Sequence, residues 1–270
     1  MAVKEKAPRK PTLSPTKLNT YLTCAIKYRY VYSDKIGKFY QRARSYFSFG
    51  ATLHNVLQEF HEQGATHSQE DLQVELEQKW ISAGYDTPAQ AQEHREAGGK
   101  IVQAYHEAHQ ERIVAQVETL FTEKTITCDL GPFKLTGRLD RIDRHSDGRL
   151  EIVDYKSGRM ETTSEQVAND LAMNCYQLIL SKLYPGTPIF ATIYCLRSGV
   201  SASAEQSPEF RAEFEREVLA LGQEIIETDY ASLRPVPIDP CPECEFLPVC
   251  ERFWRKQKRE EALDAPHTDD

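Results

Sequence analysis

Two neighbouring segments have the alternation of β-strands but carry charged side chains on an apolar face. One predicted strand covers residues 149–155. Alternation along it and into the next residue places the apolar side chains of Leu150 and Ile152 on the same side as Asp154 and Lys156. A buried acid and base destabilise a protein unless they are paired or bind a metal ion. Asp140 lies on the preceding predicted strand, residues 133–143, and a hairpin turn would bring it next to Asp154.

The two aspartates predict a divalent metal site. Carboxylates that share a site repel each other unless a cation lies between them. Oxygen ligands favour a hard ion such as Mg²⁺ or Mn²⁺, which lowers the pKa of bound water and neutralises a phosphate. Lys156 can orient that water or stabilise the negative charge that develops. The alternative is a salt bridge between Asp154 and Lys156, which is the commoner interpretation of an isolated Asp-x-Lys.

Two motifs here resemble those of the PD-(D/E)xK nuclease superfamily, specifically its RecB-like branch: Gly137-Arg138-Leu139-Asp140 and Asp154-Tyr155-Lys156-Ser157-Gly158. The resemblance implies an α/β fold, a restriction-endonuclease-like core in which helices flank a mixed sheet. It implies that Mg²⁺ or Mn²⁺ is held by His54, Asp140, Asp154 and the backbone carbonyl of Tyr155. Glu123 lies where the family often carries a further acid. Taken alone, His54 would be an ordinary surface histidine of a helix.

One feature of the family is matched only in part. The family usually follows the lysine with a helix that bears Gln-x-x-x-Tyr, which contacts DNA or steadies the site. Tyr176 matches the tyrosine, but Ala172 stands at the glutamine position. Gln177, next to Tyr176, is an alternative source of the amide. The chain therefore departs from the family pattern at this helix.

A cysteine cluster lies near the C-terminus, where Cys241, Cys244 and Cys250 form C-x₂-C-x₅-C. The pair Cys-x₂-Cys puts two thiolates on one metal centre. The N-terminal residues lack the pattern of a secretory signal, so we expect a reducing, cytoplasmic location and metal ligation rather than disulfides. Four thiolates suit zinc or a [4Fe–4S] cluster. Resemblance to AddB-type and CRISPR-associated RecB-like nucleases, carried also by residues 13–24, implies a [4Fe–4S] cluster completed by Cys24.

Charge is distributed unevenly along the chain. The net charge of −8 disfavours nucleic acid binding, but residues 1–44 carry eleven basic and only two acidic side chains. Tyrosines, Tyr46 among them, lie among or just beyond these basic residues and can stack on unpaired bases. The predicted DNA contacts are Lys35, Lys38, Arg42 and Arg44. The alternative is a solubilising segment.

Composition and patterning predict one α/β or α+β domain preceded by a helical region. Hydrophobic residues make up 40% of the chain and no apolar run is long enough for a membrane helix. The expected organisation is a disordered basic tail (1–12), a helical region with Cys24 and His54 (13–116), a nuclease core (117–230), a cysteine-rich segment packing back on the N-terminal region (231–256) and a polar tail (257–270). Strands are expected over 118–128, 133–143, 149–155 and 188–196, and helices over 48–64, 69–83, 88–116, 164–184 and 208–228.

The combined expectation is a Mg²⁺- or Mn²⁺-dependent deoxyribonuclease that acts on single-stranded or end-containing DNA in repair, recombination or defence. The chain has no G-x-x-x-x-G-K-[ST] motif, so ATP-driven unwinding would need a helicase partner. The alternative is a catalytically idle DNA-binding or scaffold subunit of a helicase–nuclease complex. The presence of Asp154, Lys156 and His54 weighs against an idle subunit.

Overall fold

The computed structural model describes residues 10–40 and 42–264, with side chains up to residue 260. The chain divides into two compact units. Unit 1 runs to Pro15 and then from Ala43 to Gln223, and unit 2 combines Thr16–Arg42 with the chain from Glu224 onward. Among the described helices, none has both the length and the apolar content needed to cross a membrane.

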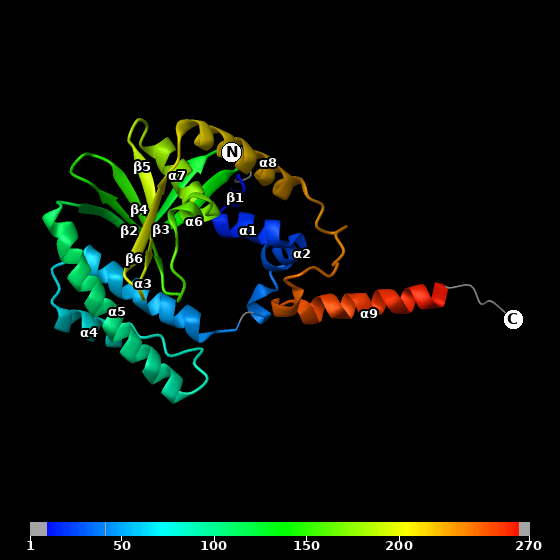
Figure 1. Cartoon of the computed structure of the whole chain (residues 1–270). Helices are drawn as coiled ribbons and strands as arrows, with labels where there is room; N and C mark the ends of the chain where they lie inside the picture. The colour runs from blue at the N-terminus through cyan, green and yellow to red at the C-terminus, as the bar shows by residue number, and fades with distance from the viewer. Residues whose placement is uncertain (1–9, 41, 265–270) are drawn as a thin grey trace, which may run out of the picture. The chain divides into compact units, whose positions relative to one another are not determined.

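The described part of unit 1 is built on a six-stranded mixed sheet (Figure 1). Its order is β1-β3-β4-β5-β6, and β2 pairs with β3. Strands β4 and β5 are parallel, whereas β3–β4 and β5–β6 are antiparallel. The strands are β1 (Thr12–Leu13), β2 (Glu118–Asp129), β3 (Lys134–Arg144), β4 (Leu150–Lys156), β5 (Ile189–Cys195) and β6 (Val200–Glu205).

Helices cover this sheet, and α3 carries His54. Val153 and Tyr155 of β4 belong to one apolar core with Phe49 and Leu53 of α3. Figure 1 shows α3, α4 and α5 together on one side of the strands and α7 on the other. The bounds are α3 (Ser45–Glu62), α4 (Gln69–Gln78), α5 (Pro88–Val114), α6 (Ser164–Ala168), α7 (Leu171–Leu183) and α8 (Pro208–Glu227).

The single helix predicted over 164–184 is wrong, because the chain forms two helices there. Thr163 and Gln166 form a capping box that starts α6. The side chain of Asp170 then accepts a hydrogen bond from the backbone of Met173 and caps α7. The new cap explains the break, and it fixes the start of the helix that bears Tyr176.

Other differences lie in short or polar elements. Thr12, expected in a disordered tail, begins β1, which pairs with β3. Strand β6 was not predicted, because its small and polar residues have little intrinsic strand preference and pairing with β5 provides its stability. The helix predicted over 69–83 ends at Gln78. The expected polar tail is helical to Asp264, whereas residues 1–9 and 265–270 lie outside the described part.

Unit 2 brings the N-terminal and C-terminal cysteine segments together. Its core includes Ile26, Tyr30, Phe246 and Cys250. An ion pair of 2.9 Å joins Lys27 to Glu245, and the indole of Trp254 donates a hydrogen bond to the carbonyl of Pro235. The elements are α1 (Pro15–Thr23), α2 (Ala25–Tyr28), π-helical η1 (Arg29–Ser33), the 3₁₀ turns η2 (Gly37–Phe39) and η3 (Cys241–Glu243), and α9 (Leu247–Asp264).

Candidate active site

The candidate site forms where β3 and β4 diverge. Their regular pairing ends at Arg141 and Val153. Beyond that pair, Oδ2 of Asp140 accepts a hydrogen bond of 2.8 Å from the backbone N–H of Tyr155. A carboxylate thus takes the place of the backbone acceptor that a continued ladder would provide. This arrangement fixes Asp140 beside β4, as the hairpin pattern predicted.

His54 reaches this point from α3. Its Nε2 lies 3.1 Å from the carbonyl oxygen of Tyr155, and its Nδ1 lies 3.3 Å from Oδ1 of Asp140 and 3.9 Å from Oε1 of Glu123. Ligand atoms of His54, Glu123 and Asp140 all lie within 4.8 Å of one another. The donor set of two carboxylates and an imidazole fits a divalent cation.

The charges around His54 determine its protonation. Burial disfavours the imidazolium, but hydrogen bonds with Asp140 and Glu123 and the charges of Asp140 and Asp154 outweigh it and raise the pKa of His54 to about 10. The imidazolium is therefore the cation between these carboxylates at neutral pH. Because a metal ligand must be a neutral imidazole, metal binding at His54 requires loss of this proton.

Glu123 has an unusual backbone conformation. It lies on β2 opposite Asp140, between the pairs Thr122–Arg141 and Lys124–Leu139. Its φ of 45° is in the left-handed region, which costs a non-glycine residue roughly 1–3 kcal/mol. Its Oε2 lies 2.5 Å from Nε of Arg138. The sequence predicted the acid at this position but contained no signal for the strained backbone that aims it.

We expect Glu123→Gly to be more stable than Glu123→Ala by about 1 kcal/mol, because only glycine adopts this φ without strain. Both variants lose the ion pair with Arg138 and a carboxylate of the site, so both should bind Mn²⁺ more weakly. Urea unfolding in EDTA measures the first effect, and Mn²⁺ titration measures the second. Equal stability of the two variants would show that the backbone at this position stores no strain.

Asp154 and Lys156 form an ion pair beside this group. Nζ of Lys156 lies 2.6 Å from Oδ2 of Asp154, without the alignment of a hydrogen bond. Burial and the charge of Asp140 raise the pKa of Asp154 to about 6, although Lys156 opposes this shift. The pKa of Lys156 is raised because Asp154 outweighs the effect of burial. The structure thus places Asp154 next to the close group of His54, Glu123 and Asp140 but outside it.

Tyr176 packs at the same site from α7. A Cβ atom on Gly137 would lie 2.4 Å from its ring, so the glycine of the first motif provides the space for this tyrosine. Burial and the charges of Asp154 and Asp140 raise the pKa of Tyr176. Gln177 is fully buried, and its Oε1 accepts a hydrogen bond from the backbone of Gln206. Burial excludes a direct contact of Gln177 with DNA, and its Nε2 has no hydrogen-bond partner among the described residues, so its role in place of the missing amide stays a prediction.

Comparison with known families agrees with this geometry. A model of the PD-(D/E)XK nuclease superfamily matches residues 12–251, which is most of the chain. The chain belongs to the PD-(D/E)XK nuclease superfamily. Membership implies a metal-dependent nuclease, and the group around His54 is the candidate metal site. No curated protein sequence matches the chain.

Solved structures support the fold of this PD-(D/E)XK protein. A candidate exonuclease from Eubacterium rectale superposes with a TM-score of 0.54 and 9% identity, covering 89% of this chain and 87% of its own. A second structure, SSO0001, shares 15% identity over 93% of this chain and 89% of its own. Its TM-score of 0.35 is too low to support an argument. The first similarity supports a shared fold.

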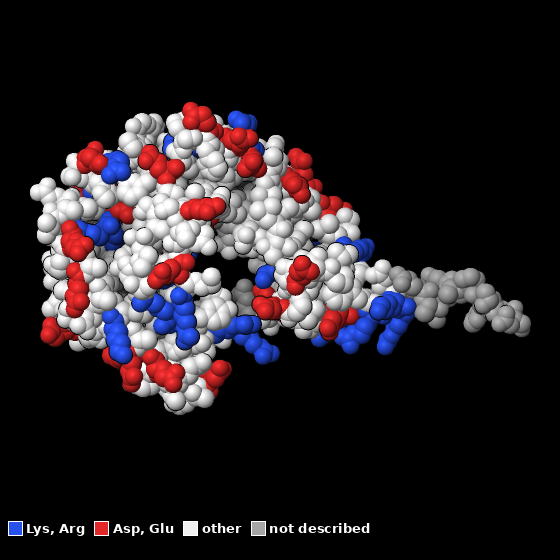
Figure 2. Space-filling view, viewed as in Figure 1, with Lys and Arg blue, Asp and Glu red and all other residues white. Residues whose placement is uncertain are grey.

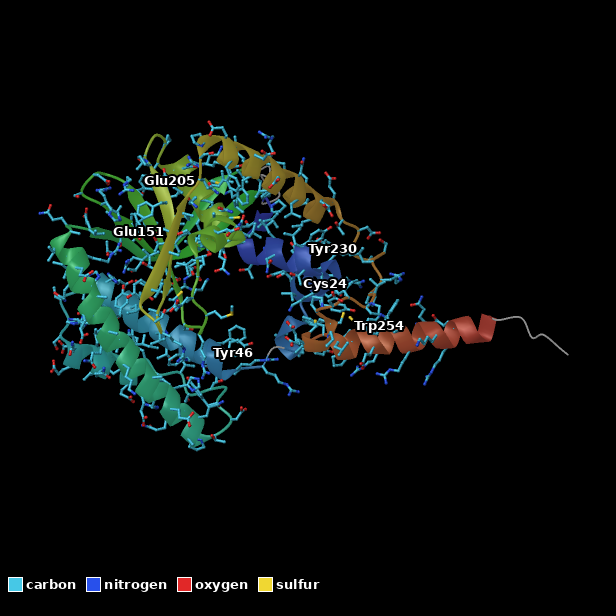
Figure 3. The ribbon with its side chains drawn as sticks, viewed as in Figure 1. Cys24, Tyr46, Glu151, Glu205, Tyr230 and Trp254 are labelled. Atoms are coloured by element: carbon cyan, nitrogen blue, oxygen red, sulfur yellow. The ribbon has the colours of Figure 1, made fainter. Side chains whose placement is uncertain are left out.

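A buried polar network lies behind the candidate active site of this PD-(D/E)XK protein. Arg141 is 1% exposed and donates to the hydroxyls of Tyr105 and Tyr155. Asp143 pairs with Arg141 at 3.0 Å and with Arg112 at 2.6 Å. Figure 3 labels Glu151, which continues the network from β4. The network holds Tyr155, whose backbone contacts both Asp140 and His54.

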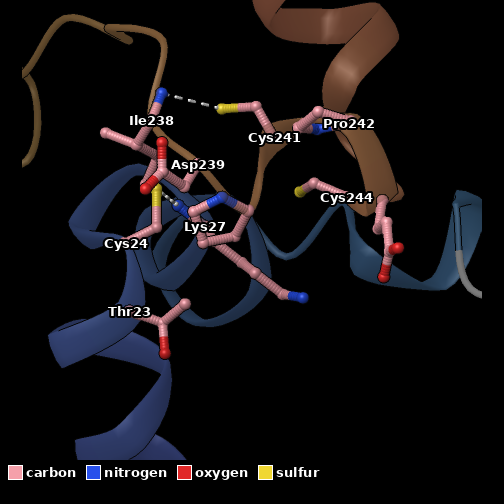
Figure 4. Close-up of a pocket in the computed structure, with 10 residues that line it drawn as sticks. Thr23, Cys24, Lys27, Ile238, Asp239, Cys241, Pro242 and Cys244 are labelled. Carbon is pink, nitrogen blue, oxygen red and sulfur yellow. Dashed lines mark hydrogen bonds between the residues drawn. The ribbon is translucent and has the colours of Figure 1, made fainter.

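Three cysteines of unit 2 line one cavity of about 600 Å³ (Figure 4). Sγ of Cys24 accepts from the backbone N–H of Lys27 at 3.3 Å, and Sγ of Cys241 accepts from that of Ile238 at 3.4 Å. Burial and the neighbouring thiols raise the pKa of Cys250. The donors fit a thiolate-bound group, although among the described residues the four sulfurs do not all lie within 4.8 Å.

The predicted DNA contacts Lys35, Lys38, Arg42 and Arg44 are all exposed. The first three belong to unit 2, and Arg44 lies in unit 1 just before α3. Figure 2 shows further basic side chains gathered on the described part of α9. These side chains are Arg252, Arg255, Lys256, Lys258 and Arg259. They were not predicted as a basic surface, because they are divided between the expected cysteine-rich segment (231–256) and the expected polar tail (257–270).

Proposed function

We propose that this protein is a Mg²⁺- or Mn²⁺-dependent deoxyribonuclease that hydrolyses phosphodiester bonds in single-stranded or end-containing DNA. The observation that carries this proposal is the close group of His54, Glu123 and Asp140 beside the ion pair of Asp154 and Lys156. Asp154 and the carbonyl of Tyr155 are the further candidate ligands. Family membership supports the reaction type.

Each residue has a distinct part in the proposed chemistry. A bound divalent ion supplies an acidified water and a positive charge at the scissile phosphate. The imidazole of His54, after losing its proton to solvent, would hold the ion together with Glu123 and Asp140. Lys156, whose side chain is 48% exposed, would orient the attacking water or a phosphate oxygen and stabilise the negative charge that develops. Tyr176 packs against Gly137 and limits access of water to the carboxylates.

The test is incubation of anaerobically purified protein with end-labelled single-stranded and duplex DNA, with Mg²⁺, with Mn²⁺ or with EDTA. We expect cleavage with a divalent ion, faster on the single strand, and none in EDTA. Binding of DNA without cleavage under all three conditions would instead indicate the idle subunit of a helicase–nuclease complex. Roles in repair, recombination or defence, and a helicase partner, belong to the same proposal.

We further propose that Lys35, Lys38, Arg42 and Arg44 contact the DNA backbone. All four side chains are exposed, and each cation that neutralises a phosphate releases counterions from it. Changing all four to glutamate should reduce the salt dependence of DNA affinity without affecting Mn²⁺ uptake. An unchanged salt slope would place the DNA path elsewhere.

For the cysteines, we propose a structural [4Fe–4S] cluster held by Cys24, Cys241, Cys244 and Cys250. The support is that three of these four cysteines, Cys24, Cys241 and Cys244, line one cavity, together with the spacing of the cysteines in the sequence. Anaerobic protein should be brown and contain iron and labile sulfide, and Cys250→Ser should lose both and give less folded protein. Cys175→Ser, at a buried cysteine of α7, is the control and should keep its iron. Stoichiometric zinc without sulfide in protein from native cells would contradict this proposal.

A further inference from the structure

The edge of the sheet beside Lys156 carries two arginines that the catalytic assignment does not use. Strands β4 and β5 are parallel and end together, with Lys156 opposite Cys195. The segments that follow carry Arg159 and Arg197, respectively. Nε of Arg197 donates a hydrogen bond of 2.9 Å to the carbonyl of Ser157, next to Lys156. The carboxyl ends of parallel strands are the usual place for ligands of α/β sheets.

These two arginines lie close together, because Arg197 donates to the carbonyl of Ser157, which precedes Arg159 by only two residues. Burial and the charge of Arg159 both lower the pKa of Arg197. Among the ion pairs formed by the described residues, none joins either arginine to a carboxylate. Two neighbouring cations without an acidic partner favour an anion, and guanidinium groups match the geometry of phosphate.

An exposed aromatic pair lies at the start of α3, next to this edge. Tyr46 and Phe47 are 54% and 63% exposed, and their ring centres are 4.3 Å apart. Figure 3 labels Tyr46 at this end of the helix. Phe47 precedes His54 by seven residues, so it shares a helix face with His54 at a distance of about 10 Å.

Contacts join the start of α3 to the arginine edge. The guanidinium of Arg197 lies 4.9 Å above the ring of Phe49, in the same turn as Tyr46. One residue later, a Cβ atom on Gly50 would lie 2.9 Å from Oγ of Ser157, so this helix passes close to the chain that follows Lys156. The start of α3, which carries the aromatic pair, therefore lies next to the segments that carry Lys156, Arg159 and Arg197.

We propose that Tyr46, Phe47, Arg159 and Arg197 form a binding surface for single-stranded DNA that leads to Lys156. The arginines contact a phosphate, and the exposed rings stack on an unpaired base. A duplex offers no free base faces to these rings, so the surface selects single strands. The inference rests on the proposed nuclease function and adds the residues that determine its substrate.

The experiment compares Tyr46→Ser/Phe47→Ser and Arg159→Gln with two matched control variants on α8. Phe210→Ser removes another exposed, stacked phenylalanine, and Arg216→Gln removes another exposed arginine. The probes are a fluorescent oligo-dT and an abasic strand of equal length, with Ca²⁺ as the ion during binding. Mn²⁺ titration of each variant checks that the active site is intact.

The aromatic double variant should bind oligo-dT about 10- to 100-fold more weakly and the abasic strand as wild type does. Arg159→Gln should weaken the binding of both probes and reduce the salt slope of the binding constant by about one. The controls should bind as wild type. The inference would be overturned if the aromatic variant bound oligo-dT as wild type does, or lost equal affinity for both probes. It would also be overturned if the wild-type protein bound duplex DNA as tightly as oligo-dT. A wild-type protein that cuts no DNA with Mn²⁺ would instead contradict the proposed nuclease function.

Discussion

Replacement of Asp140 by asparagine should reduce DNA cleavage by about 10³-fold or more and weaken Mn²⁺ binding strongly. Asparagine keeps an oxygen that can accept the backbone hydrogen bond of Tyr155, so the divergence of β3 and β4 should be retained. It removes the negative charge that Asp140 contributes next to Glu123 and His54. Single-turnover cleavage and Mn²⁺ titration measure the two effects on the same preparation.

A second measurement on this variant reports the charge directly. Asp140 raises the pKa of His54, so Asp140→Asn should bring that pKa down from about 10. An NMR titration of His54 without metal measures this shift. Asp147→Asn, in the exposed turn between the same strands, is the matched control and should change neither cleavage nor the pKa of His54. Normal cleavage by Asp140→Asn would show that the carboxylate of Asp140 is not part of the metal site.

The sequence predicted the convergence of the active-site residues because strand alternation and a hairpin are local rules. Asp154 continues an apolar stripe, Asp140 shares a strand face with Ile142, and a turn between their strands brings the two faces together. His54 was beyond such rules, since its position depends on how α3 packs on the sheet. Resemblance to a family supplied that information, and the distance of 3.3 Å between Nδ1 of His54 and Asp140 agrees with it.

Features that depend on long-range packing were not predictable in this way. Arg141 and Asp143 are charged residues in a strand, and composition alone suggests exposure, yet both are 1% exposed. Their burial depends on Arg112 and Tyr105, which come from a helix about thirty residues earlier. The φ of Glu123 and the short strand β1 are likewise set by tertiary contacts that no local pattern encodes.

Replacement of Lys156 by alanine should separate DNA binding from catalysis. The carboxylates and His54 remain in this variant, so at about pH 8.5, where Asp154 stays ionised, Mn²⁺ and DNA should bind nearly as in wild type. Cleavage should fall by about 10²–10³-fold, because a preorganised positive charge acts mainly on the transition state. The control is Lys182→Ala on α7, which removes a comparably exposed lysine that pairs at 2.7 Å with Glu215 of α8. This control should cut DNA normally.

The ion pair with Asp154 gives this experiment a further readout. Lys156 lowers the pKa of Asp154, so in Lys156→Ala that pKa should rise above about 6 and the carboxylate should need a higher pH to ionise. Assays at about pH 8.5 keep Asp154 charged and isolate the loss of the lysine. A defect that persists there assigns the rate loss to Lys156 itself, and Lys156→Arg should restore part of it. If Lys156→Ala cuts DNA at a near-normal rate at that pH, the contact of 2.6 Å between Lys156 and Asp154 is only a salt bridge.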